Sequence, residues 1–246
     1  MPYSTQYPRC IFCGDRANSR EHAIPKWMSK RLGIKGQMSV FSGNVTSRKQ
    51  PVSFASHRAR IFCQPCNAHF KHLEDAVIPL FVPMAKGRVI VLGKESQELL
   101  SLWASKTTMA LIAAGPPELR EIVPLEHRRV IREQGIPPPN TWVAFIPWRG
   151  DPQGFVAGST LDQYGMGPDL SCETYTVVFA AAQIAFKVVG MIDPLPAKHI
   201  IEGDRRGICQ FWPPLTNLIS WPPDGLAATG ADMPRLISFA PVRRTE

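Results

Sequence analysis

Two Cys-x-x-Cys pairs constrain the fold of this chain more than any other feature. The first pair is Cys10 and Cys13, and the second is Cys63 and Cys66. Four thiolates from two such knuckles form the tetrahedral ligand set of a closed structural zinc site, which stabilises a fold without taking part in chemistry. The sequence therefore predicts one Zn²⁺ bound by these four cysteines.

The rest of the sequence indicates the compartment in which the cysteines are found. Its first residues show no secretory leader, and nowhere do about 18 apolar residues run together, so we expect a cytoplasmic protein with no membrane partner. In that reducing setting paired cysteines bind metal rather than form disulfides. We expect the separate Cys172 and Cys209 to be buried thiols.

Side chains suited to hydrolytic chemistry accompany the two pairs. Glu21 and His22 lie between the pairs, and Asn67 directly follows the last cysteine. A histidine titrates near neutrality and can act as a general base, while carboxylate and amide oxygens suit a hard cation such as Mg²⁺ or Mn²⁺. This combination predicts a phosphodiester-cleaving site. The alternative is that His22 is a core histidine or supports the zinc site.

In the order of these pieces the chain resembles the HNH (ββα-metal) nuclease superfamily. The resemblance covers roughly residues 8–80, about a third of the chain. With an asparagine directly after the last zinc cysteine, the chain is similar to the branch that includes phage junction resolvases of the endonuclease VII type. The matching pieces are Cys10-x-x-Cys13, Glu21-His22-x-x-Pro25-x-Trp27, Cys63-x-x-Cys66-Asn67 and Leu73-Glu74.

The resemblance implies two antiparallel strands and a helix around one catalytic cation, with zinc as an outer brace. It implies that His22 activates the water and that Glu21 and Asn67 hold the cation. We expect Glu74 to orient a basic or imidazole neighbour, and Lys71 either to touch a phosphate or to remain solvated. One such site cuts one strand at a time, so a double-strand break requires a homodimer or two successive events.

The charge of the chain is unevenly distributed. Residues 1–94 hold 15 Lys and Arg against four acidic residues, a balance of +11, whereas residues 95–246 hold 13 against 16, a balance of −3. Basic density around a candidate site favours a polyanion, and nucleic acid is the commonest. The alternative is a solvated basic face with no partner.

Composition and hydrophobic patterning predict an α+β protein of two parts. The resemblance implies a zinc-braced ββα-metal (HNH) domain, which we place at residues 1–94. We expect an α+β domain of smaller strands at 95–246, because 24 prolines break the chain into short elements. The spacing of apolar residues predicts helices at 26–32, 67–78, 96–114 and 124–134, a loop at 33–43, and strands at 50–62, 89–92, 142–146, 175–179, 184–189 and 218–221.

Together these features predict a metal-dependent HNH endonuclease that nicks DNA. The alternative from another class is a noncatalytic zinc module that binds nucleic acid. A third hypothesis gives residues 95–246 a sensing or partner-binding task that regulates cutting.

Overall fold

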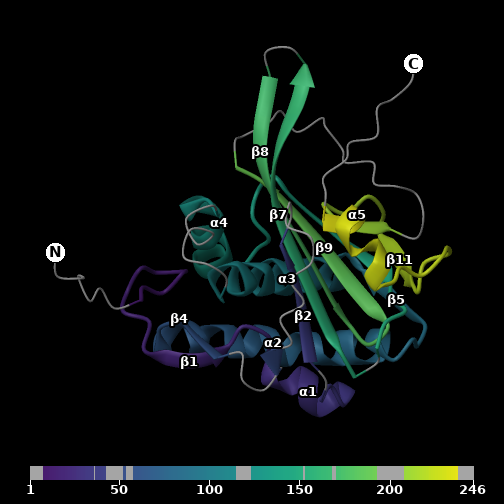
Figure 1. Cartoon of the computed structure of the whole chain (residues 1–246), viewed down its shortest axis with the longest axis horizontal. Coiled ribbons are helices and arrows are strands. Elements are labelled where there is room, and N and C mark those ends of the chain that lie inside the picture. Colours follow the sequence, from purple (N-terminus) through teal and green to yellow (C-terminus); the bar gives the residue numbers. More distant parts are fainter. Residues whose placement is uncertain are drawn as a thin grey trace.

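A seven-stranded sheet forms the centre of the molecule (Figure 1). The computed structural model describes residues 8–35, 37–42, 52–53, 58–114, 123–151, 153–167, 170–192 and 208–237. The strand order is β10-β6-β9-β8-β7-β2-β3, and all neighbours are antiparallel except β2 and β7. The strands are β2 (Gln37–Ser42), β3 (Val52–Ser53), β6 (Thr141–Pro147), β7 (Phe155–Gly167), β8 (Leu170–Ala181), β9 (Ile184–Met191) and β10 (Cys209–Trp212).

Two long helices, α2 (Gln64–Ala85) and α3 (Lys94–Ala114), pack side by side across one face of this sheet (Figure 1). The ring of Trp103 on α3 lies 5.8 Å from that of Phe179 and 5.5 Å from that of Phe186, between ring centroids. Phe81 of α2 stacks on Phe186 at 5.7 Å. Aromatic pairs at such distances add about 0.5–1.5 kcal/mol each to the burial of their area, so this layer is the main core.

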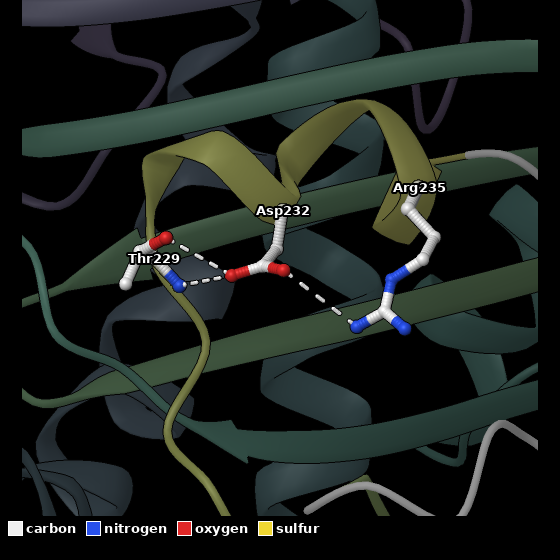
Figure 2. A network of polar contacts seen from close by, with 3 residues as sticks. All are labelled: Thr229, Asp232 and Arg235. Carbon is white, nitrogen blue, oxygen red and sulfur yellow. Dashed lines mark hydrogen bonds and ion pairs between the residues drawn. The ribbon is translucent and has the colours of Figure 1, made fainter.

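A short C-terminal element covers part of the other face. It consists of η4 (Gly230–Asp232) and α5 (Met233–Ile237), whose apolar side chains pack on the sheet. Figure 2 shows how it begins: the backbone N–H and the hydroxyl of Thr229 donate to Asp232 at 2.8 and 3.0 Å, and Arg235 lies 3.7 Å from the same carboxylate. This reciprocal cap satisfies amide groups that the first turn leaves without partners.

Two small sheets and three short helical segments complete the fold. Strands β1 (Ser19–His22) and β4 (Arg58–Phe62) pair with each other, as do β5 (Ile90–Gly93) and β11 (Leu218–Trp221). The helical segments are α1 (Lys26–Leu32), α4 (Leu125–Arg129) and the wide turn η3 (Val130–Gln134). Among the described helices, none combines the length and apolar character that a membrane span requires.

The mixed helix and strand composition confirms the predicted α+β class, and the helices expected at 26–32 and 124–134 are present as α1 and as α4 with η3. The expectation of smaller strands after residue 94 is wrong, because β7 and β8 have 13 and 12 residues. They pair with each other along nearly their whole length, which satisfies the hydrogen bonds of their backbone groups. The prolines and glycines of this part of the sequence did not indicate strands of that length.

Helix α2 is longer than the predicted 67–78. It contains Pro79 and Pro83, although an interior proline removes a hydrogen bond and costs about 3 kcal/mol or more. Phe81 and Met84 in this last part are buried in the main core. Tertiary burial therefore overrides the local signal to end the helix, and α2 reaches from one end of the molecule to the other.

The prediction of a loop at 33–43 is also wrong, because this segment contains strand β2. Residues Met38 to Ser42 pair in parallel with Phe155 to Ser159 of β7. Within the segment 50–62, where a strand is expected, the structure has β3 and β4, and residues 50–51 and 54–57 lie outside the described residues. Strand β2, from residues 1–94, lies in the same sheet as strands of residues 95–246, and one apolar core extends from Cys10 to Trp221. The two regions therefore share the sheet and the core. Separate folding of 1–94 and 95–246 stays a prediction.

Candidate metal centre and adjoining residues

The four cysteines of the two knuckles converge at the N-terminal end of α2. The sulfur atoms of Cys10, Cys13, Cys63 and Cys66 all lie within 4.8 Å of one another, and those of Cys13 and Cys63 are 3.4 Å apart. In a tetrahedron with metal–sulfur bonds of about 2.3 Å, the sulfurs are about 3.8 Å apart. The cluster is therefore of the size that a Zn²⁺ ion requires, consistent with a zinc site.

The first knuckle is a tight turn held by its own backbone. The amide of Gly14 donates to the carbonyl of Cys10 at 2.9 Å, and the amide of Cys10 donates to that of Asp15 at 2.6 Å. Gly14 has φ of 79°, in the left-handed region that glycine enters without steric cost. The turn brings Cys10 and Cys13 onto one side, and the amide of Ile11 donates to Ile61 of β4, which joins this knuckle to the second.

The second knuckle is the start of a helix. Cys63 is the N-cap of α2, and its sulfur accepts the amide of Cys66 at 3.5 Å. Asn18, near the first knuckle, accepts the amide of Gln64 at 3.0 Å and so caps the same helix from outside. The positive end of the dipole of α2 favours negative charge, which suits a cluster of thiolates.

Burial works against ionised thiols until a cation is present. It raises the pKa of Cys66 to about 11, while a hydrogen bond from Arg132 acts in the opposite direction. Burial also raises the pKa of Cys13. A bound divalent cation reverses this balance, because coordination deprotonates a thiol outright. The donor set therefore fits a zinc ion, whose positive charge would offset the negative charges of the four thiolate sulfurs.

The residues expected around a catalytic cation belong to one unit of two strands and a helix. Strand β1 carries Glu21 and His22 and pairs antiparallel with β4, so that His22 lies opposite Arg58. After β4 the chain continues through Cys63 directly into α2. This helix lies against β1 and carries Asn67 in its first turn. His22 and Asn67 are half-buried, and the side chain of Glu21 lies outside the described residues.

Glu74, expected to orient a basic neighbour, pairs with Lys106 of α3. Its carboxylate lies 2.6 Å from the Lys106 ammonium, whose side chain is only 4% exposed against 23% for Glu74. The same ammonium lies 5.4 Å from the ring centroid of Phe62 and 5.8 Å from that of Phe70. A buried cation of this kind requires its partner, so the pair joins the helix that carries Asn67 to the central helix α3.

Two residues of this region had no counterpart in the sequence analysis. Lys106 lies in the middle of α3 among buried side chains. Its position as a single charge in an apolar stretch of that helix is the sequence signal that could have identified it. Arg132 donates its Nε–H to the Cys66 sulfur at 3.4 Å. The separation of 66 residues along the chain gave no sign of that contact.

Exposed basic side chains are distributed along the N-terminal region. Lys71 on α2 and Arg60 on β4 belong to the elements that adjoin the cysteines, and the histidines His69 and His72 beside Lys71 are exposed as well. Lys26, Lys30 and Arg31 lie on α1, whose Trp27 packs 5.5 Å from Phe81 near the other end of α2, and Lys35 follows that helix. The lysines and arginines attract a polyanion through the summed field of their charges.

A separate cavity of about 550 Å³ lies at the other end of α2. It is lined by Trp148, Gln183, Trp221 and Pro222, among others, and the Trp221–Pro222 bond is cis. Trp221 is buried and donates its indole N–H to the carbonyl of Met84 at 2.9 Å. Since α2 has 22 residues and is about 33 Å long, this cavity is no part of the cysteine-held region.

Of the two other cysteines, Cys209 is half-buried in β10, and the side chain of Cys172 lies outside the described residues. The class that the structure defines is thus an α+β protein with a tetra-cysteine cluster of metal-binding dimensions. Comparisons with protein-family models, with curated proteins and with solved structures found no match to this chain.

Proposed function

We propose that this protein is a zinc-braced, divalent-metal-dependent endonuclease of the HNH type that nicks DNA. The observation that carries the proposal is the unit formed by β1, β4 and α2. The strand with Glu21 and His22, its antiparallel partner, and the helix with Asn67 occur in the order that the resemblance implies. The cysteine cluster lies at the junction of β4 and α2.

Zinc has a structural role in this proposal. Its four ligands would be Cys10, Cys13, Cys63 and Cys66, which leave no coordination position for water or substrate. Chemistry therefore belongs to neighbouring side chains. The ion would hold the first knuckle to the start of α2, because Cys10 and Cys13 come from the former, and Cys63 and Cys66 from the N-cap and first turn of the latter. Cys63 directly follows β4, so that strand would be tied to the same site.

His22 would act as the general base. It would take a proton from the attacking water, and the phosphodiester would then lose its alkoxide leaving group. Glu21 and Asn67 would hold Mg²⁺ or Mn²⁺, which supplies charge to stabilise the developing oxyanions. Asn67 lies in the first turn of α2, where helix amides add positive potential next to the negative phosphate.

DNA is the proposed substrate because of the positive charge of the N-terminal region. The exposed cations of α1, β4 and α2 lie in the region whose balance is +11. Each phosphate that they neutralise releases counterions, so binding should weaken with salt at a slope of about −0.9 per contact on duplex DNA. A sequence-independent surface of this kind suits an enzyme that nicks a backbone rather than reads bases.

The test is a plasmid-nicking assay with Mg²⁺ or Mn²⁺ that compares the parent protein with His22→Ala. Loss of the base should lower the rate by about 10²–10⁴, while DNA binding and zinc content stay unchanged. His72→Ala is the matched control, since it removes an exposed histidine of α2. Glu21→Ala and Asn67→Ala should lose activity that higher Mg²⁺ or Mn²⁺ partly restores.

Two results would contradict the mechanism. One is a parental rate from His22→Ala, and the other is cleavage by the parent in excess chelator. If DNA binding and zinc persist without any cleavage, the protein is instead a noncatalytic zinc module that binds nucleic acid.

A further inference from the structure

Arg132 belongs to the C-terminal region but contacts the cysteine cluster. Its Nε–H donates to the sulfur of Cys66 at 3.4 Å. Arg132 as a whole residue is half-buried. Burial lowers the pKa of His69 on α2, and the nearby charge of Arg132 lowers it further. All four cysteines come from the first 66 residues, so this is a contribution to the cluster from a distant part of the chain.

The position of Arg132 is fixed by the wide turn η3. The amide of Gly135 donates to the carbonyl of Val130 at 3.1 Å, five residues back, and Gly135 closes the turn with φ of 66°. Val130 and Ile131, directly before Arg132, are buried in the protein interior. Turns of this width occur mostly as single insertions in helices and often at functional sites. Here two buried anchors hold the arginine toward Cys66.

The chemistry of a four-thiolate zinc site explains why such a donor matters. Four thiolates around one Zn²⁺ leave two excess negative charges in a region where three of the cysteines are buried. A guanidinium is always charged and holds its donors in a rigid fork. An N–H donor to a ligand sulfur both orients the ligand and offsets part of the excess charge, as outer partners of metal ligands generally do.

We propose that Arg132 is a positioning residue of the zinc site, so that tight retention of zinc by the N-terminal cysteines requires the C-terminal region. The inference rests on the proposed zinc site and is independent of nuclease activity. The contact also couples zinc binding to the packing of η3. If Arg132 strengthens zinc binding, bound zinc must stabilise the packing of η3 by the same free energy.

The experiment measures zinc affinity by competition with a chromophoric chelator in the full-length protein. Arg132→Met keeps an aliphatic stem but removes the charge and the donor, and it should weaken zinc binding by about 10–100-fold. Arg132→Lys keeps the charge without the fork and should fall between Arg132→Met and the parent. Arg129→Ala removes an exposed arginine of the neighbouring α4 and is the matched control, with no expected change.

Cobalt substitution adds a readout that general loss of stability would not produce. In Co²⁺-loaded protein, Arg132→Met should shift the sulfur-to-cobalt charge-transfer band while the tetrahedral ligand-field bands remain. A parent that holds well under one zinc per chain would refute the zinc site itself. A zinc-binding parent with Arg132→Met within twofold of its affinity would overturn the role of Arg132 alone. If Arg132→Met is insoluble, parental affinity and a parental cobalt spectrum in Arg132→Lys would overturn it equally.

Discussion

The corner that carries the cysteines and the seven-stranded sheet differ in what holds them together. In the corner, residues 8–24 and 58–70, the two strands have four and five residues. In the sheet, β6 to β9 have seven to thirteen residues, and Phe179 and Phe186 are buried against Trp103. A two-stranded ribbon is marginal in water by itself, whereas the sheet has a large apolar core. Both regions share one apolar core, in which Phe12, Phe62 and Phe70 of the corner are buried. We expect the corner to depend on its ligand cluster in addition, and the sheet not to.

Removal of zinc gives the largest expected effect, and it should separate the two regions. Without the ion, the two knuckles would lose the metal–sulfur bonds between them, and four thiols would lie in close contact. Metal binding in such small units supplies much of their folding free energy. Chelation, or Cys63→Ser, should expose the amides of 8–24 and 58–70 to hydrogen exchange while those of β6 to β9 stay protected. Simultaneous loss of protection in both regions would remove the distinction. Cys209→Ser serves as the control.

Disruption of the ion pair between the corner and the sheet layer is the next largest effect. Glu74→Ala leaves the Lys106 ammonium buried without its carboxylate, which should lower the free energy of unfolding by about 3–5 kcal/mol. Lys106→Met should cost less, because Glu74 retains contact with solvent. A double-mutant cycle by urea denaturation measures the coupling. Equal costs for the two single variants and no coupling would show that the pair contributes little.

A pH titration should reveal a buried histidine that belongs to the sheet side. His127 is 4% exposed, its Nδ1 lies 2.9 Å from the Tyr175 hydroxyl, and burial lowers its pKa to about 4. The unfolded chain takes up a proton near pH 6.5 and the folded one only near 4. Stability should therefore fall by about 1 kcal/mol per pH unit as the pH drops through that window.

The pH dependence can be assigned with a substitution. His127→Gln keeps a polar group for Tyr175 and should flatten the curve of unfolding free energy between pH 6.5 and 4. An unchanged slope would show that another group is responsible. His72→Gln, at an exposed position, is the control.

The smallest effect concerns the C-terminal cap of the sheet. Thr229→Ala removes the hydroxyl that caps η4, which typically costs about 1 kcal/mol. Thermal unfolding of the sheet should shift downward by a few degrees, with exchange in the corner unchanged. Thr216→Ala, at an exposed turn position, is the comparison. A shift no larger than that of the comparison variant would mean that α5 is held by its apolar contacts alone.

The sequence predicted the cysteine cluster because ligand chemistry is local: two residues between paired cysteines are enough to form a knuckle. Short helices with clear end signals were also predictable, as at α1, where Gly33 closes the helix with φ of 72°. Each knuckle and each helix end depends on residues a few positions apart.

Tertiary structure alone decided the features that depend on burial between distant segments. Helix α2 continues through Pro79 and Pro83 because Phe81 and Met84 are buried, and β2 forms because the edge of β7 offers partners for its backbone. The pairing of Glu74 with Lys106 and the contact of Arg132 with Cys66 join residues 32 and 66 positions apart. No local pattern encodes such contacts, because their free energy comes from desolvation and packing that exist only after the chain has folded.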